Sequence, residues 1–255
     1  MPFPTMHKND VANVAKEVEL ERKEIYDDIV FDYSAIKTNV FGKEHLDPEF
    51  FKAVGNVEGC SLLDLACGSG YYTKLLKQKG ASEVIGVDIS EGMIKEADKD
   101  ELEHSLGITY VVGDASKYVH GHEMDVVTGA FLLCYADSEE NLLKFCENIY
   151  ANLKCGGKFV TMQPVLDETC NLEDMTLGYT FVPYVNEKKP DTLYDGVQVD
   201  VTIYSADFKS KCSFPSFLWK SQTISKLLYA VGFEDVKIVP ILTGTPYMIT
   251  VATKQ

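Results

Sequence analysis

One stretch constrains the fold of this chain more than any other. An apolar run at 62–66 contains Asp64, continues into a turn with Gly68 and Gly70, and leads into a helical pattern. A second apolar run, 83–88, ends in another acid, Asp88. Glycine lets a backbone approach a ligand closely, and an acid at the tip of the next strand can accept hydrogen bonds from two ribose hydroxyls. The stretch therefore predicts a strand, a tight turn, a helix and a site for a nucleoside-containing cofactor.

Apolar runs and helical patterns alternate from residue 60 onward, which predicts an α/β fold with a doubly wound, mostly parallel sheet. We expect strands at 61–66, 83–88, 108–113, 125–131 and 158–163, with helices at 71–79, 91–104 and 138–153. Gly156 and Gly157 are expected to end the last of these helices. The alternation stops at Pro164 and returns with a helix at 220–231 and strands at 234–239 and 247–253.

These patterns divide the chain into four parts. We expect a helical N-terminal cap over 1–58, a cofactor-binding core over 59–163, an inserted substrate lid over 164–219, and completion of the core over 220–255. Within the cap, Asp47 and Pro48 are expected to be the cap and first residue of a short helix. Within the lid, alternation at 197–204 and 208–214 predicts a hairpin.

Composition narrows the classes of partner. The chain of 255 residues has a net charge of −15, which opposes nucleic-acid backbones and anionic membranes. The seven cysteines are scattered, as is typical of a reducing compartment, and no long apolar run predicts a membrane span. We expect a soluble, cytoplasmic protein that is a monomer or a homodimer.

The glycine turn differs from the fingerprint of dinucleotide-binding proteins. Thr73 stands where that fingerprint has its third glycine, and Tyr71 and Tyr72 fill the space where a diphosphate would pass. Asp64, Asp88 and a third acid, Asp114, are expected at or near the ends of three strands, the edge where open α/β sheets bind ligands. A cofactor without phosphates is favoured, and a nicotinamide oxidoreductase is disfavoured.

Four motifs together, at 64–70, 87–94, 112–115 and 153–159, resemble the class I S-adenosylmethionine-dependent methyltransferases. The segments 131–136 and 149–153 are most similar to small-molecule members such as the toxoflavin-biosynthesis N-methyltransferase. The resemblance implies a seven-stranded Rossmann-like methyltransferase fold, with S-adenosyl-L-methionine as cofactor and S-adenosyl-L-homocysteine as product.

The resemblance also implies which residues contact the cofactor. Glycines and Asp64 would line its amino-acid end, Asp88 its ribose, and Asp114 with Ala115 the edge of its adenine. The full set comprises Tyr26, Tyr33, Asp64, Ala66, Gly68, Gly70, Asp88, Ile89, Met93, Gly113, Asp114, Ala115 and Phe131. For Tyr26 and Tyr33, ordinary packing of an aromatic helix is an equal alternative.

Catalysis and acceptor binding have weaker signals. Methyl transfer can rest on placement alone; if a base or acceptor contact is needed, His45 and Gln163 are the candidates. The residues expected to bind the acceptor are Tyr135, Gln163, Tyr179, Phe181 and Trp219. His120 and His122 are expected to be exposed in a loop, and two histidines are too few for a zinc site, so no metal is expected.

The favoured function is transfer of a methyl group to an O or N atom of a small molecule. Two alternatives stay open: a protein or peptide methyltransferase, and a non-catalytic module that binds S-adenosylmethionine.

Overall fold

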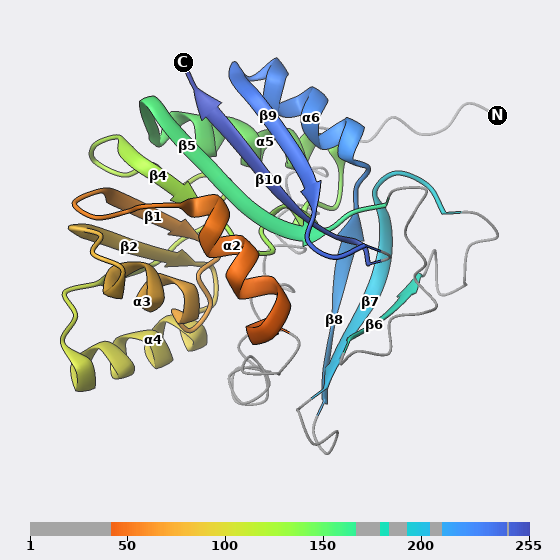
Figure 1. Cartoon of the computed structure of the whole chain (residues 1–255). Helices are drawn as coiled ribbons and strands as arrows, with labels where there is room; N and C mark the ends of the chain where they lie inside the picture. Colours follow the sequence, from red (N-terminus) through yellow and green to blue (C-terminus); the bar gives the residue numbers. More distant parts are fainter. Residues whose placement is uncertain (1–41, 167–178, 184–192, 205–210, 244) are drawn as a thin grey trace, which may run out of the picture.

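The computed structural model describes residues 42–166, 179–183, 193–204, 211–243 and 245–255. They form one large sheet with helices on both faces and a second, smaller sheet beside it (Figure 1). The predicted tyrosines Tyr26 and Tyr33 lie outside the described residues.

The large sheet has seven strands in the order β3-β2-β1-β4-β5-β10-β9. Pairings from β3 to β5 are parallel, while β10 pairs antiparallel with both β5 and β9. This is the doubly wound, mostly parallel sheet predicted from the sequence. The strands are β1 (Ser61–Leu65), β2 (Glu83–Asp88), β3 (Thr109–Val112), β4 (Met124–Thr128), β5 (Leu153–Pro164), β9 (Phe233–Pro240) and β10 (Tyr247–Lys254).

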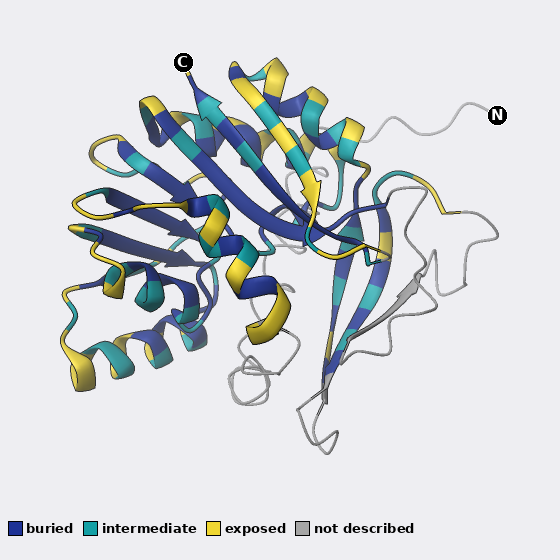
Figure 2. Cartoon of the chain, viewed as in Figure 1, coloured by how far each residue is buried: buried dark blue, intermediate teal, exposed yellow. Residues whose placement is uncertain are grey.

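Apolar side chains from both faces of this sheet make the core. Every residue of β1 is buried, as expected for a central strand covered on both faces (Figure 2). One apolar cluster joins the sheet to α2 (Asp47–Val54) and α3 (Tyr71–Gln78), and the other joins it to α5 (Glu139–Ala151) and α6 (Ser221–Ala230). A fifth helix, α4 (Glu91–His104), connects β2 to β3, with Ser90 accepting a hydrogen bond from Met93 N at its start.

The smaller sheet is antiparallel and has the order β6-β7-β8. Its strands are β6 (Tyr179–Pro183), β7 (Val197–Tyr204) and β8 (Lys211–Leu218). The arrowheads of β1, β2 and β4 point toward it in Figure 1, so it lies on the carboxyl side of the parallel strands. Trp219, just after β8, donates from Nε1 to Ala136 O at 2.9 Å, which ties this sheet to the short 3₁₀ turn η2 (Leu133–Tyr135).

Several boundaries differ from those predicted. The strand expected at 125–131 ends at Thr128, and the strand expected at 158–163 begins at Leu153, so Gly156 and Gly157 lie inside it. At these glycines β5 shifts register against β4, and its pairing with β4 resumes at Lys158. The expected hairpin is a three-stranded sheet, since β6 is added by pairing with β7.

Asp47 does not cap α2 as predicted. It lies inside the helix, and its carboxylate is used by hydroxyl donors from α3 instead. A π-helical segment, η1 (Gly42–Leu46), precedes it. Within the described ranges, no helix combines the length and apolar character needed to cross a membrane.

Candidate cofactor site

A pocket opens at the carboxyl edge of the sheet, between β1 and β4, where the strand order changes direction. This is the switch point at which open α/β sheets bind ligands. The residues that line it come from the segments after β1, β2, β3 and β4 and from α3, α4 and α5: Asp64, Ala66, Cys67, Gly68, Tyr72, Asp88, Ile89, Met93, Asp114, Ala115, Ala130, Phe131, Leu132, Tyr135 and Phe145.

Asp64 lines this pocket and accepts two hydroxyl hydrogen bonds. Thr73 Oγ1 of α3 donates to its Oδ2 at 2.6 Å, and Thr128 Oγ1 of β4 donates to its Oδ1 at 2.8 Å. All three residues are buried. The two hydroxyl donors orient the carboxylate.

Asp88 ends β2 and is oriented by backbone donors. Gly68 N donates to Oδ2 at 2.7 Å, and Ser90 N donates to Oδ1 at 3.0 Å. The first bond links the glycine turn to the neighbouring strand, so the turn and the acid are positioned together. The two backbone donors thus orient both oxygens of the carboxylate.

Asp114 follows β3 and is the least buried of the three acids. Burial raises the pKa of its carboxyl, but hydrogen bonds from Lys117 and from the backbone and hydroxyl of Ser116 outweigh burial, so the pKa lies below its ordinary value. Lys117 Nζ lies 2.7 Å from Oδ2, and its side chain is 65% exposed. The carboxylate is therefore ionised at neutral pH.

Two non-glycine residues of the pocket have a left-handed backbone. Ala66 (φ 56°) follows β1, and Phe131 (φ 64°) follows β4. Such backbones cost free energy and persist where their surroundings hold them; Phe131 N donates to Met162 O at 2.7 Å. The strain lies at the two strand ends that frame the pocket.

The two tyrosines after the glycine turn converge on one acid. Tyr71 Oη donates to Asp47 Oδ2 at 2.6 Å, and Tyr72 Oη donates to Asp47 Oδ1 at 2.8 Å. Burial, the hydrogen bond to Asp47 and its negative charge all raise the pKa of Tyr71. Tyr72 lines the pocket, so Asp47 fixes one wall of it from α2.

Gly70, predicted to contact the cofactor, does not line the pocket. It has φ +81° and begins α3, and a Cβ there would lie 2.3 Å from the Tyr110 hydroxyl oxygen. This glycine therefore makes room for Tyr110 beneath the turn. Burial, then the charges of Cys67 and Asp64, raise the pKa of the Tyr110 hydroxyl, and that oxygen has no hydrogen-bond partner among the described residues.

Several other predicted residues are not among the described residues that line the pocket. Gly113 packs against Val87 and Tyr118. His45 is exposed in η1, and Trp219 is buried with its indole N–H bound to Ala136 O. Gln163 is buried and accepts from Thr161 Oγ1 at 3.0 Å. Tyr179 and Phe181 lie in β6, whose side chains are outside the described part of the structure.

Nine predicted cofactor residues and the acceptor candidate Tyr135 line this pocket, Tyr72 joins them from the turn where the sequence placed it, and four further lining residues were not predicted. The missed residues are Cys67, Ala130, Leu132 and Phe145. Cys67 and Ala130 are sequence neighbours of predicted residues, so the predicted strand ends already indicated this part of the pocket. Phe145 lies on the apolar stripe of α5, where its pattern is that of a core residue and carries no separate signal.

The lining as a whole favours a cationic ligand without phosphates. Its charged members are three carboxylates, and none of the described residues that line it is a lysine, arginine or histidine. Its other members are mainly apolar or aromatic, which suits an adenine ring and a thioether-like chain. An anionic diphosphate would meet unfavourable charge here.

Comparison with known proteins agrees with this geometry. Residues 62–157 match the family model described as a methyltransferase domain. The demethylmenaquinone methyltransferase of Lactococcus lactis is 31% identical over 59% of this chain and 61% of its own length. The 18S rRNA (guanine(1575)-N(7))-methyltransferase of Saccharomyces cerevisiae is 34% identical over 41% of each chain. The chain spans about half the length of the curated relatives it matches.

The fold recurs in a solved S-adenosylmethionine-dependent methyltransferase from Clostridium acetobutylicum. The TM-score is 0.65 at 21% identity, and the match covers 90% of this chain and 98% of the other. The resemblance to this class, predicted from four motifs, is confirmed. Residues 62–157 thus match a methyltransferase domain, and the fold is that of a solved S-adenosylmethionine-dependent methyltransferase.

Proposed function

We propose that the chain is an enzyme that transfers a methyl group from S-adenosylmethionine to an O or N atom of a small-molecule acceptor. The observation that carries this proposal is the pocket at the switch point of the sheet, with three ordered carboxylates and apolar walls. A cationic, phosphate-free cofactor is the ligand that suits this lining.

Each acid has a distinct part in holding the cofactor. Asp88 would accept from the ribose hydroxyls, because its two oxygens are already oriented by Gly68 N and Ser90 N. Asp114 and the backbone N–H of Ala115 would bind the edge of the adenine. Asp64, fixed by two threonine hydroxyls, would face the ammonium group at the amino-acid end.

Apolar residues complete the binding surface. Ile89 and Met93 follow Asp88 in the pocket and would flank the adenine. Tyr72, Phe131 and Tyr135 present aromatic rings on the pocket wall, and such rings attract a cationic group electrostatically. These residues would also keep water from the reacting atoms.

Catalysis would rest mainly on placement. S-adenosylmethionine supplies a methyl group already activated by its sulfonium, so the protein has to hold the acceptor atom in line with it. Such placement can supply roughly 7–11 kcal/mol of the barrier. His45 is exposed and outside the pocket lining, so we do not assign it a proton-transfer role.

The acceptor would enter from the side of the smaller sheet. We propose that the segment 164–219 is a lid over the acceptor and that 1–58 is a cap beside it. In support, Ser216 Oγ donates to Cys134 O at 3.4 Å, and Trp219 Nε1 donates to Ala136 O. Both bonds attach the smaller sheet to η2, whose Tyr135 lines the pocket.

An RNA acceptor is the main rival, because one relative carries an rRNA methyltransferase name. The net charge of −15 opposes a polyanionic acceptor.

Three acceptor pools distinguish the candidates: a library of neutral and cationic metabolites, total RNA and a protein extract. With S-adenosylmethionine labelled on its methyl group, we expect label in small molecules. Label confined to RNA or protein would contradict the small-molecule acceptor, and binding of the cofactor without transfer to any pool would contradict the enzyme.

A further inference from the structure

We propose that Glu83, His120 and His122 bind one divalent metal ion of the zinc type, at the edge of the sheet opposite the cofactor pocket. One ligand atom from each residue lies within 4.8 Å of those of the other two. Two histidines in one loop were too few for a site, but the fold brings them to an acid that lies 39 positions before His122.

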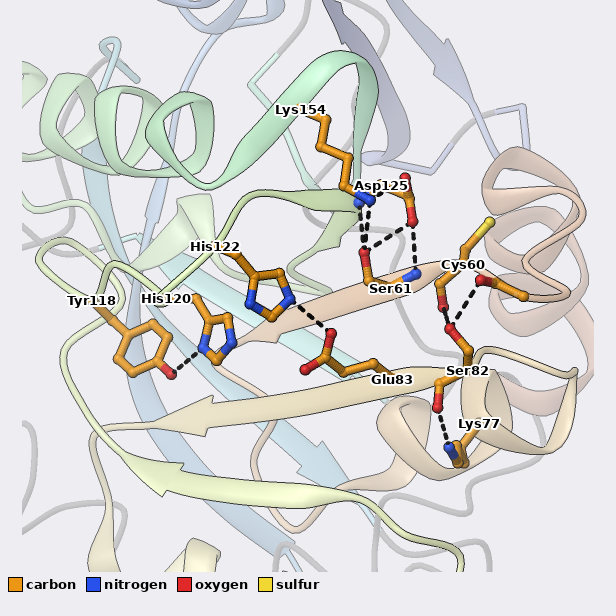
Figure 3. A network of polar contacts seen from close by, with 11 residues as sticks. Cys60, Ser61, Lys77, Ser82, Glu83, Tyr118, His120, His122, Asp125 and Lys154 are labelled. Carbon is orange, nitrogen blue, oxygen red and sulfur yellow. Dashed lines mark hydrogen bonds and ion pairs between the residues drawn. The ribbon is translucent and has the colours of Figure 1, made fainter.

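The three side chains of this cluster already lie close together. His122 Nε2 lies 2.8 Å from Glu83 Oε2, and the rings of His120 and His122 lie 4.6 Å apart at 75°. Figure 3 shows both imidazoles beside the Glu83 carboxylate. With metal–ligand distances of about 2.0–2.2 Å, ligand atoms lie roughly 3.3–3.6 Å apart, so the widest separation, up to 4.8 Å, would have to close by roughly 1 Å, while Glu83 Oε2 and His122 Nε2 would have to move apart. Glu83 and His122 are 42% and 54% exposed, so they have room to do so.

His120 is the most firmly positioned of the three. Tyr118 Oη lies 3.1 Å from His120 Nδ1, and the two rings are stacked. This contact leaves Nε2 as the nitrogen available to a metal, and in Figure 3 that side of the ring faces Glu83. An outer partner on the second ring nitrogen is the usual arrangement for a histidine that binds a metal.

Hydrogen bonds to two buried asparagines hold the loop that carries His120. His120 N donates to Asn152 Oδ1 at 2.8 Å, and Asn152 Nδ2 donates to Tyr118 O at 2.8 Å. Asn148 Nδ2 also donates to Tyr118 O at 2.8 Å. Both asparagines are buried on or beside α5. A loop held by buried amides keeps its imidazole in place before any metal arrives.

The donor set determines the class of metal. Two imidazoles and one carboxylate suit zinc and its neighbours, whereas calcium and magnesium prefer all-oxygen sites. Three protein ligands at an exposed site leave a fourth position for water. Glu83 begins β2 and Asp88 ends it, so the metal would lie about 16 Å from the ribose-binding acid and act as a clamp between β2 and the loop before β4.

Zinc titration by calorimetry tests the proposal, with the full chain purified without a polyhistidine tag and kept reduced by a phosphine. We expect one zinc site, and at least about tenfold weaker binding for His120→Gln and for His122→Gln. His104→Gln is the matched control, because His104 is exposed and paired with one carboxylate, that of Asp100. Its zinc affinity should equal that of the unmodified chain.

X-ray absorption of the zinc-loaded protein identifies the ligands directly. Nitrogen and oxygen neighbours at about 2.0–2.2 Å are expected; a sulfur shell at about 2.3 Å would place the zinc on a cysteine such as the exposed Cys155 and would overturn the assignment. Absence of zinc binding, or unchanged affinity in both histidine variants when circular dichroism shows them folded, would overturn it as well.

Discussion

Replacing Asp88 by alanine should weaken the binding of S-adenosylmethionine by about 100-fold or more. A hydrogen bond to a charged acceptor is worth about 1.5–3 kcal/mol, and the proposed pose gives Asp88 two such bonds to the ribose. Even the lower value sums to about 3 kcal/mol, and each 1.4 kcal/mol is a factor of ten. Gly68 N and Ser90 N would also lose their acceptor, which loosens the glycine turn and adds to the loss.

Calorimetric titration with the cofactor measures this change. Asp88→Asn keeps the size of the side chain and one carbonyl acceptor, so its affinity should lie between those of the unmodified chain and of Asp88→Ala. Asp98→Ala is the control, because it removes an exposed acid from α4. If Asp88→Ala is folded by circular dichroism and binds the cofactor as tightly as the control, Asp88 does not hold the ribose and the pose is wrong.

Three further changes test the surroundings of the pocket. Asp47→Ala should lower the pKa of Tyr71, which ultraviolet titration of tyrosinate measures. It should also lower the free energy of unfolding in urea by on the order of 2 kcal/mol, because two hydroxyls lose a charged acceptor. An unchanged Tyr71 titration would contradict this. Gly70→Ala should destabilise the fold by about 2 kcal/mol or more, because the backbone there is left-handed and the new Cβ would clash with the Tyr110 hydroxyl. Adding Tyr110→Phe removes that hydroxyl and should recover part of the loss. If the losses of the two changes simply add, the contact is not the cause. Hydrogen bonds from Lys154 and Ser61 lower the pKa of Asp125 to about 2. The ionised carboxylate should therefore stabilise the fold above about pH 4, and this contribution should be lost as the pH falls toward about 2. The stability difference between the unmodified chain and Asp125→Asn should vanish with it; a difference that persists at the lowest pH would contradict the assignment.

Local patterns predicted the frame of this molecule well. The strand at 83–88 and the helix at 91–104 lie where the sequence placed them, because burial periodicity and the Ser90 cap act over a few neighbouring residues. The acids at strand ends could be expected to meet, since parallel strands end at one edge of a sheet.

Features that depend on distant contacts were not predictable. Asp47 reads as a helix cap, yet it binds hydroxyls 24 and 25 positions later in the chain. Gly70 reads as a close approach to a ligand, yet the space it leaves holds Tyr110. Glu83 carries no metal signal by itself, because its neighbours in the cluster come from a loop that packs on α5. In each case tertiary packing, and not the spacing of residues in the sequence, determines which residue is the contact partner.

A crystal structure with S-adenosylhomocysteine tests the central claim most directly. We predict that the ribose hydroxyls lie within hydrogen-bond distance of the Asp88 carboxylate, at about 2.5–3.0 Å. The adenine should lie against Ile89 and Met93, and its edge should face Asp114 and Ala115. A ligand bound elsewhere on the chain, or one whose ribose does not contact Asp88, would contradict the account.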